Sequence, residues 1–172
     1  MTSTASSGLG RYADAGGDGT RLVEVRLVNF PLAVYVRAYE HHQELMREFA
    51  LLALAPPIPR PGHDVPARLL ELIEVLGRRY AASADDTDAV RDAAIARGET
   101  AIDLTYTVPE SARDACLRLG ELMDAADEFC RDENLLTLAS EPDEVAFRRW
   151  YLDEFVRQID GAEPTPWRGP LA

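Results

Sequence analysis

The sequence has no lysine: all 18 of its basic residues are arginine. It also has only two cysteines and three histidines among 172 residues. No apolar run approaches the roughly 20 residues that a membrane span requires, and the first residues lack the basic start and apolar middle of a secretory signal. We therefore expect a cytoplasmic protein that does not bind membranes.

The short motifs that usually carry enzyme chemistry are missing as well. The chain contains no GxxxxGK[ST] phosphate loop, GxGxxG, HExxH, GxSxG or paired CxxC. His41 and His42 are adjacent, so on a helix their rings point about 100° apart and cannot easily hold one metal ion. We expect no cofactor, no metal site and no catalytic residues. An enzyme is therefore a less favoured function than either a regulatory protein or a small-molecule sensor.

The two cysteines lie in one predicted helix. Cys116 and Cys130 are fourteen residues apart, which is roughly 21 Å along a helix, whereas a disulfide needs Cα atoms within about 7 Å. They therefore cannot pair with each other. Both fall on the apolar stripe of that helix, which favours buried, inert thiols over reactive ones.

The net charge of −12 is unevenly distributed. Residues 1–82 contain nine acidic residues and nine arginines, whereas residues 83–172 contain twenty-one acidic residues and nine arginines. Nucleic acid is an improbable partner, because its binding depends on basic contacts to phosphate. The acidic half is either a solvated surface or a docking surface for a basic partner.

Two segments alternate between apolar and polar residues, the pattern of half-buried strands. Residues 22–28 place Val25 and Leu27 on one side, and residues 101–108 repeat the pattern more strongly. Each segment runs into a proline, Pro31 or Pro109, that we expect to open a helix.

The remaining periodicity is helical, and it predicts a mostly helical domain. Helices are expected over 31–54, 65–81, 87–97, 109–132 and 141–160, with a proline-rich loop over 55–63 and a third strand over 135–139. The first helix is apolar over most of its circumference and is expected to be central. Ser140, followed by Asp143, is expected to cap the last helix.

These elements predict an α+β fold in which about five helices pack on a small sheet of about three strands. The expected organisation is a disordered N-terminal tail over 1–20, a single domain over 21–160 and an irregular C-terminal tail over 161–172. Trp167 is expected to pin part of the C-terminal tail to the domain.

The last helix carries the first candidate site, in the run from Phe147 to Tyr151. Its periodicity directs Arg149 towards the apolar stripe and Trp150 towards the polar side, where a tryptophan beside arginines is typical of an interface hot spot. The alternative is a tryptophan packed under the C-terminal tail. The candidate partner-binding residues are Arg148, Trp150, Tyr151 and Arg157.

The second candidate is a ligand pocket between the first helix and the sheet. Its expected residues are Tyr39, His42 and Arg149. His42 shares a helical stripe with Tyr39 and Phe49, so a hydrogen-bonded histidine at the core edge is the alternative interpretation.

The stretches from Arg26 to Leu54 and from Phe147 to Leu152 resemble an actinobacterial protein family. Genes of that family lie beside genes for anti-sigma-factor-type ATP-binding proteins and their antagonists. The resemblance implies a role near partner-switching signalling and brings no catalytic residue with it. The chain lacks the Asp-x-Gly-x-Gly loop of those kinases, so ATP binding is not expected.

Two functions follow as predictions. The first is a non-catalytic regulatory or adaptor protein that acts through contact with another protein, with self-association left open. The second is a small-molecule sensor that uses the pocket at the first helix.

Overall fold

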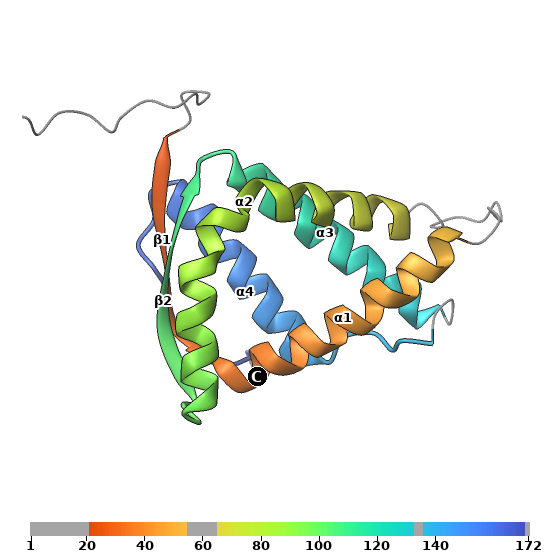
Figure 1. Ribbon diagram of the computed structural model, residues 1–172, viewed down its shortest axis with the longest axis horizontal. Coiled ribbons are helices and arrows are strands. Elements are labelled where there is room, and N and C mark those ends of the chain that lie inside the picture. Colours follow the sequence, from red (N-terminus) through yellow and green to blue (C-terminus); the bar gives the residue numbers. More distant parts are fainter. Residues whose placement is uncertain (1–20, 55–64, 133–135, 171–172) are drawn as a thin grey trace, which may run out of the picture.

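The computed structural model describes residues 21–54, 65–132 and 136–170, and within them every side chain except those of 53, 54, 65, 66 and 75–86. Two strands and four helices follow one another in these ranges (Figure 1). They are β1 (Leu22–Pro31), α1 (Leu32–Leu54), α2 (Val65–Ala96), β2 (Ala101–Pro109), α3 (Ala112–Arg131) and α4 (Pro142–Ile159). The N-terminal tail over 1–20 and the proline-rich loop over 55–63 lie outside the described residues.

The two strands form one antiparallel sheet. Leu27 pairs with Leu104, and both are buried on the face that meets the helices. Residues such as Glu24 lie exposed on the other face, as is common for antiparallel sheets. The alternation predicted for 22–28 and 101–108 is confirmed.

A bulge interrupts β1 after Leu27, where the register shifts before Phe30. Asn29 adopts φ 58° there, a left-handed conformation that asparagine tolerates better than most residues. The extra residue turns Phe30 towards the buried face. The Asn29 backbone N–H donates to Asp103 Oδ1 (2.8 Å), and its Nδ2 donates to the Trp167 carbonyl oxygen (2.6 Å). The bulge therefore ties β1 to β2 and to the C-terminal segment.

Side chains of two helices cover the outer edges of this small sheet. Gln158 of α4 donates to the Arg26 carbonyl oxygen and accepts from the Arg26 N–H, both at 2.8 Å. Its amide thus occupies the place of a third strand beside β1. At β2, Thr87 Oγ1 of α2 donates to the Thr105 carbonyl oxygen (3.0 Å). These bonds satisfy groups that would otherwise be open to another strand.

The expected third strand over 135–139 is wrong for its described part, because residues 136–139 contain no strand. Glu48 of α1 accepts hydrogen bonds from the backbone N–H groups of Leu136 (2.6 Å) and Thr137 (2.8 Å). A side chain of α1, and not a neighbouring strand, therefore satisfies this backbone. Leu136 is 94% exposed, so its apolar side chain faces no core. The described sheet has two strands, not about three, within the expected α+β class.

The two helices expected over 65–81 and 87–97 are one helix, α2. No proline or glycine occurs between Gly77 and Gly98, so nothing in this stretch ends a helix. Figure 1 shows α2 as two legs that meet at a bend, with the second leg alongside β2. The predicted break between residues 81 and 87 is therefore wrong, because the helix continues through it.

The helices lie on one side of the sheet and form two apolar cores (Figure 1). The core next to the sheet includes Phe30, Phe147 and Phe155. The second core joins α1, α2 and α3 through residues such as Leu45 and Phe49. The expectation that the first helix is central is wrong. Besides its buried residues α1 has strongly exposed ones, and Leu51 is 69% exposed.

The helix starts differ from the prolines and caps expected. Pro31 and Pro109 end the two strands, and the helices begin after them. At α4 the capping residue is Glu141, not Ser140. Its side chain accepts from the backbone of Glu144, and Glu144 Oε2 accepts from the Glu141 N–H at 3.1 Å. Ser140 instead donates its backbone N–H and its hydroxyl to Asp127, and its Oγ accepts from Arg148.

Candidate functional site

A cavity of about 440 Å³ lies among the helices. Its wall comes from α1, α3 and α4, with one residue from α2. The described residues that line it are Tyr35, Ala38, Tyr39, His42, Ile73, Leu119, Met123, Phe147, Arg148, Tyr151 and Leu152. None of these belongs to a strand, so the expected position between the first helix and the sheet is wrong. The volume falls within the usual range of small-molecule sites, about 300–1,000 Å³.

The wall is almost entirely apolar, because α1, α3 and α4 each direct part of their apolar face towards the cavity. Aromatic rings dominate the α1 side, where Tyr35 and Tyr39 stack with ring centroids 5.9 Å apart. Phe147 of α4 contacts the Tyr35 ring edge-on at 6.4 Å. These contacts hold the rings in fixed orientations around the cavity, which favours a preformed site over one that must be assembled.

A few polar groups lie in this apolar wall. Burial, with the neighbouring His41, lowers the pKa of His42 below 6.5, so its ring is neutral at pH 7. Burial raises the pKa of Tyr35 to about 12. Burial and the neighbouring Tyr106, to which it is hydrogen-bonded, raise the pKa of Tyr151 well above 10. All three groups are therefore uncharged at neutral pH.

The charged residue in the wall is Arg148, and it belongs to a partly buried ion-pair network. Its Nη2 donates to Asp124 Oδ1 (2.7 Å) and to Asp127 Oδ2 (2.8 Å), and its Nη1 donates to Ser140 Oγ (3.3 Å). The Arg148 side chain is 12% exposed and that of Asp127 3%. The network joins α3, the segment before α4 and α4 itself.

Asp127 is ionised because its partners outweigh its burial. Burial alone would raise the pKa of this carboxyl. Hydrogen bonds from the Ser140 backbone, the Arg148 guanidinium and the Ser140 hydroxyl reverse that effect and hold the pKa below 3.8. The negative charge on Asp127 in turn keeps the guanidinium of Arg148 paired at the cavity wall.

The expected orientation of Arg149 is wrong. Its side chain is 67% exposed and pairs with Asp124 at 3.2 Å. The buried stripe of α4 contains Leu152 and Phe155, and Arg148 precedes these by four and seven residues, so Arg148 takes the inward place. Of the three expected pocket residues, Tyr39 and His42 therefore line the cavity and Arg149 does not.

The C-terminal segment covers Trp150, which makes the alternative interpretation the correct one. Trp150 Nε1 donates to the Thr165 carbonyl oxygen (3.0 Å), and its ring lies 5.5 Å from that of Trp167. Trp167 is buried and donates its backbone N–H to Val28 of β1 (3.0 Å). Trp150 therefore anchors the chain end. Its side chain is half-buried and also lines a hollow between α3, α4 and residues 165–170, so it is not on the fully open face that was expected.

The four candidate partner-binding residues do not form one exposed patch. Arg148 is in the ion-pair network, Trp150 lies under the C-terminal segment, and Tyr151 lines the cavity. Arg157 donates to Glu154 and to Thr165 Oγ1 (2.8 Å), so it also holds the C-terminal segment. Their role in binding a partner stays a prediction.

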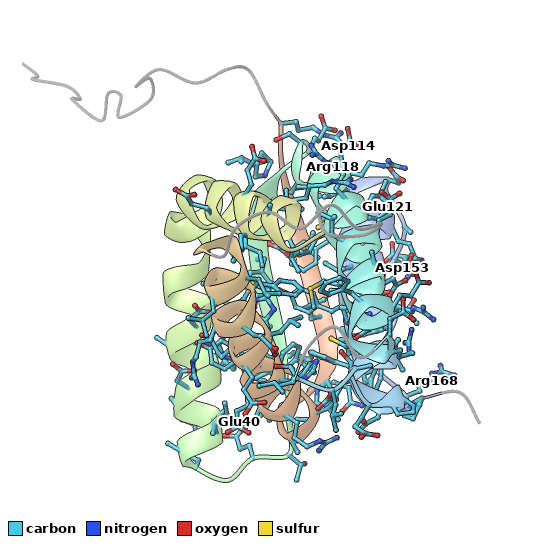
Figure 2. The ribbon with its side chains drawn as sticks, turned by 90° about the vertical axis from the view of Figure 1, so that its right-hand side faces the viewer. Glu40, Asp114, Arg118, Glu121, Asp153 and Arg168 are labelled. Carbon is cyan, nitrogen blue, oxygen red and sulfur yellow. The ribbon has the colours of Figure 1, made fainter. Side chains whose placement is uncertain are left out.

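Arg149 lies at a second hollow, of about 840 Å³, between α3, α4 and residues 165–170. Figure 2 shows Asp114, Arg118 and Glu121 of α3 and Asp153 of α4 along this side of the molecule. The surface carries both signs of charge and is exposed. It is one exposed part of the acidic half that a partner could reach.

Cys130 is buried and Cys116 half-buried, and both are free thiols. Burial raises the pKa of each to about 11. Within the described residues, no group of three or more His, Cys, Asp and Glu side chains is placed to hold a metal ion. Among the described helices, none has the length and apolarity needed to cross a membrane.

Comparison of the chain with protein-family models, curated proteins and solved structures finds no match. The resemblance to a partner-switching family stays a prediction.

Sequence reasoning missed several residues that line the cavity, above all Ala38, Met123 and Phe147. Met123 lies on the apolar stripe predicted for its helix, and such a stripe predicts core residues. Helical spacing identifies an inward face, but it does not show whether that face meets another side chain or an empty space. Arg148 could have been found from its spacing to Leu152 and Phe155.

Proposed function

We propose that this protein binds a small, largely apolar molecule in the cavity between α1, α3 and α4, and thereby acts as a sensor. The observation that supports the proposal is a space of about 440 Å³ with aromatic and aliphatic walls. The space opens to solvent at Tyr39, which is 51% exposed, and apolar pockets of this size are usual binding sites for small molecules. The single histidine and the arginine network give the wall the few polar groups that orient a ligand.

The test uses N-phenyl-1-naphthylamine, a neutral dye that fluoresces in apolar surroundings. We expect the purified protein to bind it with a saturable rise in fluorescence. Ala38→Met places a longer side chain in the cavity and should weaken binding at least about ten-fold. Ala50→Met makes the same change at an exposed position of the same helix and should leave binding unchanged.

A second cavity variant protects this test against a folding defect. Leu119→Phe fills the space from α3, and circular dichroism melts show whether each variant is folded. Folded cavity variants that bind the dye as well as the wild type would mean that the dye binds elsewhere. A wild-type protein that does not bind the dye would contradict the proposal.

Regulation through contact with a protein partner is the second proposed function. It is supported by the exposed face of α3 and α4, where Glu121 and Asp153 lie (Figure 2), and by the excess of acidic residues in this half of the chain. Charge complementarity would select a basic partner. The association rate constant with a basic partner protein should fall as the salt concentration rises, since exposed charges are screened beyond about 10 Å at 0.1 M. An association rate that ignores ionic strength would contradict this proposal.

A further inference from the structure

The charges in the cavity wall restrict which ligands it accepts. We infer that the ligand is a neutral molecule, mostly apolar, with one hydroxyl, carbonyl or amide group that hydrogen-bonds to His42. The inference rests on the proposed function, because it names the ligand class of the same cavity. It depends on two observations, the pairing of Arg148 and the state of His42.

The positive charge of Arg148 is balanced by two carboxylates, although its buried Nε has no hydrogen-bond partner among the described residues. Arg148 is the one cation among the described residues of the wall, and its Nη2 already meets carboxylate oxygens of Asp124 at 2.7 Å and Asp127 at 2.8 Å. Two carboxylates therefore surround one guanidinium. A carboxylate or phosphate brought into the cavity would lose its hydration and meet no unpaired cation, which is costly.

A cationic ligand is disfavoured for a related reason. Of the two carboxylates near Arg148, neither Asp124 nor Asp127 lines the cavity, and both are engaged by the arginine. Tyr35 and Tyr151 of the wall are neutral, since burial keeps the pKa of each above 10. An ammonium group would therefore meet no carboxylate in the cavity, and contacts with the aromatic rings would offset only part of its desolvation.

His42 supplies a neutral hydrogen-bonding group instead. It lies in the wall between aromatic and aliphatic side chains, and no described residue hydrogen-bonds to its ring. A neutral imidazole carries one N–H donor and one nitrogen acceptor. It can therefore donate to a carbonyl group, or both donate to and accept from a hydroxyl or amide group.

Four ligands with the same ring separate these possibilities: 4-methylbenzyl alcohol, p-xylene, 4-methylbenzoate and 4-methylbenzylammonium. Each is titrated at pH 7.5 against bound N-phenyl-1-naphthylamine. We expect the alcohol to displace the dye at a concentration at least about ten-fold lower than either ion. It should also displace the dye about three- to ten-fold more readily than p-xylene, as one hydrogen bond predicts.

His42→Leu tests the hydrogen bond itself. The variant should remove the advantage of the alcohol over p-xylene while p-xylene binds within about two-fold of its wild-type affinity. Tightest binding of the benzoate or the ammonium would overturn the inference and leave the cavity proposal standing. An advantage of the alcohol that survives in the variant would exclude His42 as its partner. A dye that does not bind the wild-type protein would overturn the cavity proposal and this inference with it.

Discussion

Two neighbouring arginines of α4 have opposite surroundings, and this difference can be measured. Arg148 is buried between Asp124 and Asp127, whereas Arg149 is 67% exposed and meets Asp124 at 3.2 Å. Arg148→Gln should lower the free energy of unfolding by about 3 kcal/mol, because Asp127 would stay buried without its ionic partner. Arg149→Gln should change it by less than about 0.5 kcal/mol.

Chemical denaturation of both variants at pH 7 provides the measurement. The two substitutions are identical and adjacent, so differences in helix propensity cancel. Equal losses of stability would mean that the ion pairs of Arg148 contribute no more than a surface pair.

Asp127 should make the protein sensitive to acid. Its pKa in the folded state lies below 3.8, so its ionised form contributes stability that is fully present well above pH 3.8. This stability is lost as the pH falls through the lowered folded-state pKa. The gap in unfolding free energy between wild type and Asp127→Asn should therefore be constant from pH 6 to 7 and shrink below about pH 4. A gap that does not change down to pH 3 would contradict the lowered pKa.

The two thiols should react slowly in the folded protein. Their pKa of about 11 leaves about a hundred-fold less thiolate at pH 8 than a thiol with a pKa of 9 would have. Labelling with a maleimide should be slow in buffer and should become fast in denaturant, when burial is lost. Cys116 should react before Cys130, because it is half-buried rather than buried. Rapid labelling of both thiols in the folded state would show that the apolar face of α3 is accessible to solvent.

At the scale of the elements, the C-terminal segment should contribute strongly to stability despite its lack of helix or strand. Trp167 packs into the core beside the sheet, and Glu154 accepts from the Thr165 N–H at 2.9 Å. Trp167→Ala should cost about 3 kcal/mol, the usual loss for a large buried ring.

Trp150 serves as the graded comparison for this element. Trp150→Ala should cost about 2 kcal/mol, and Trp150→Phe about 1 kcal/mol, because phenylalanine keeps most of the ring contacts and loses the bond to Thr165. Thermal melts distinguish the three variants. If the Trp150→Ala protein is as stable as the parent, Trp150 does not anchor the C-terminal segment, and the exposed interface position predicted from its spacing would be correct.

The elements also show how far the sequence could predict this fold. Both strands and the amphipathic helix α3 were predicted because their periodicity is regular, and Leu122, Met123 and Ala126 are indeed buried. The prediction of a third strand was wrong because the local sequence pattern does not show that Glu48, 88 residues from Leu136, accepts a hydrogen bond from the Leu136 backbone. Long-range side-chain bonds of this kind have no local signal.

The candidate site was less predictable than the fold for the same reason. Tyr39 and His42 were placed at a pocket from one helix alone, and they line the cavity. The other wall depends on how α3 and α4 face α1. The inward face of α4 was predicted one residue too far along the chain, so Arg149 was expected at the pocket where the structure has Arg148. A cavity is the space that packing leaves, so it requires the relative placement of helices that sequence periodicity does not contain.

At the scale of the whole molecule, the cavity lies between the two cores, because residues of both cores line it. Phe147 belongs to the core next to the sheet and also lines the cavity. Its ring lies about 6 Å from both tryptophans of the chain, at 6.1 Å from Trp150 and 6.0 Å from Trp167. A guest that contacts Phe147 should therefore change intrinsic tryptophan fluorescence, whereas no change on saturation would place the guest elsewhere.

The presence of a guest can be observed most directly in a crystal of the protein pressurised with xenon. Xenon is apolar and enters apolar cavities without needing a specific hydrogen bond. We expect a xenon atom in the space between α1, α3 and α4, in contact with Ala38 and Met123, and none in crystals of Ala38→Met. Side chains that close this space in the crystal, or xenon bound only at other positions, would contradict a ligand cavity in this protein.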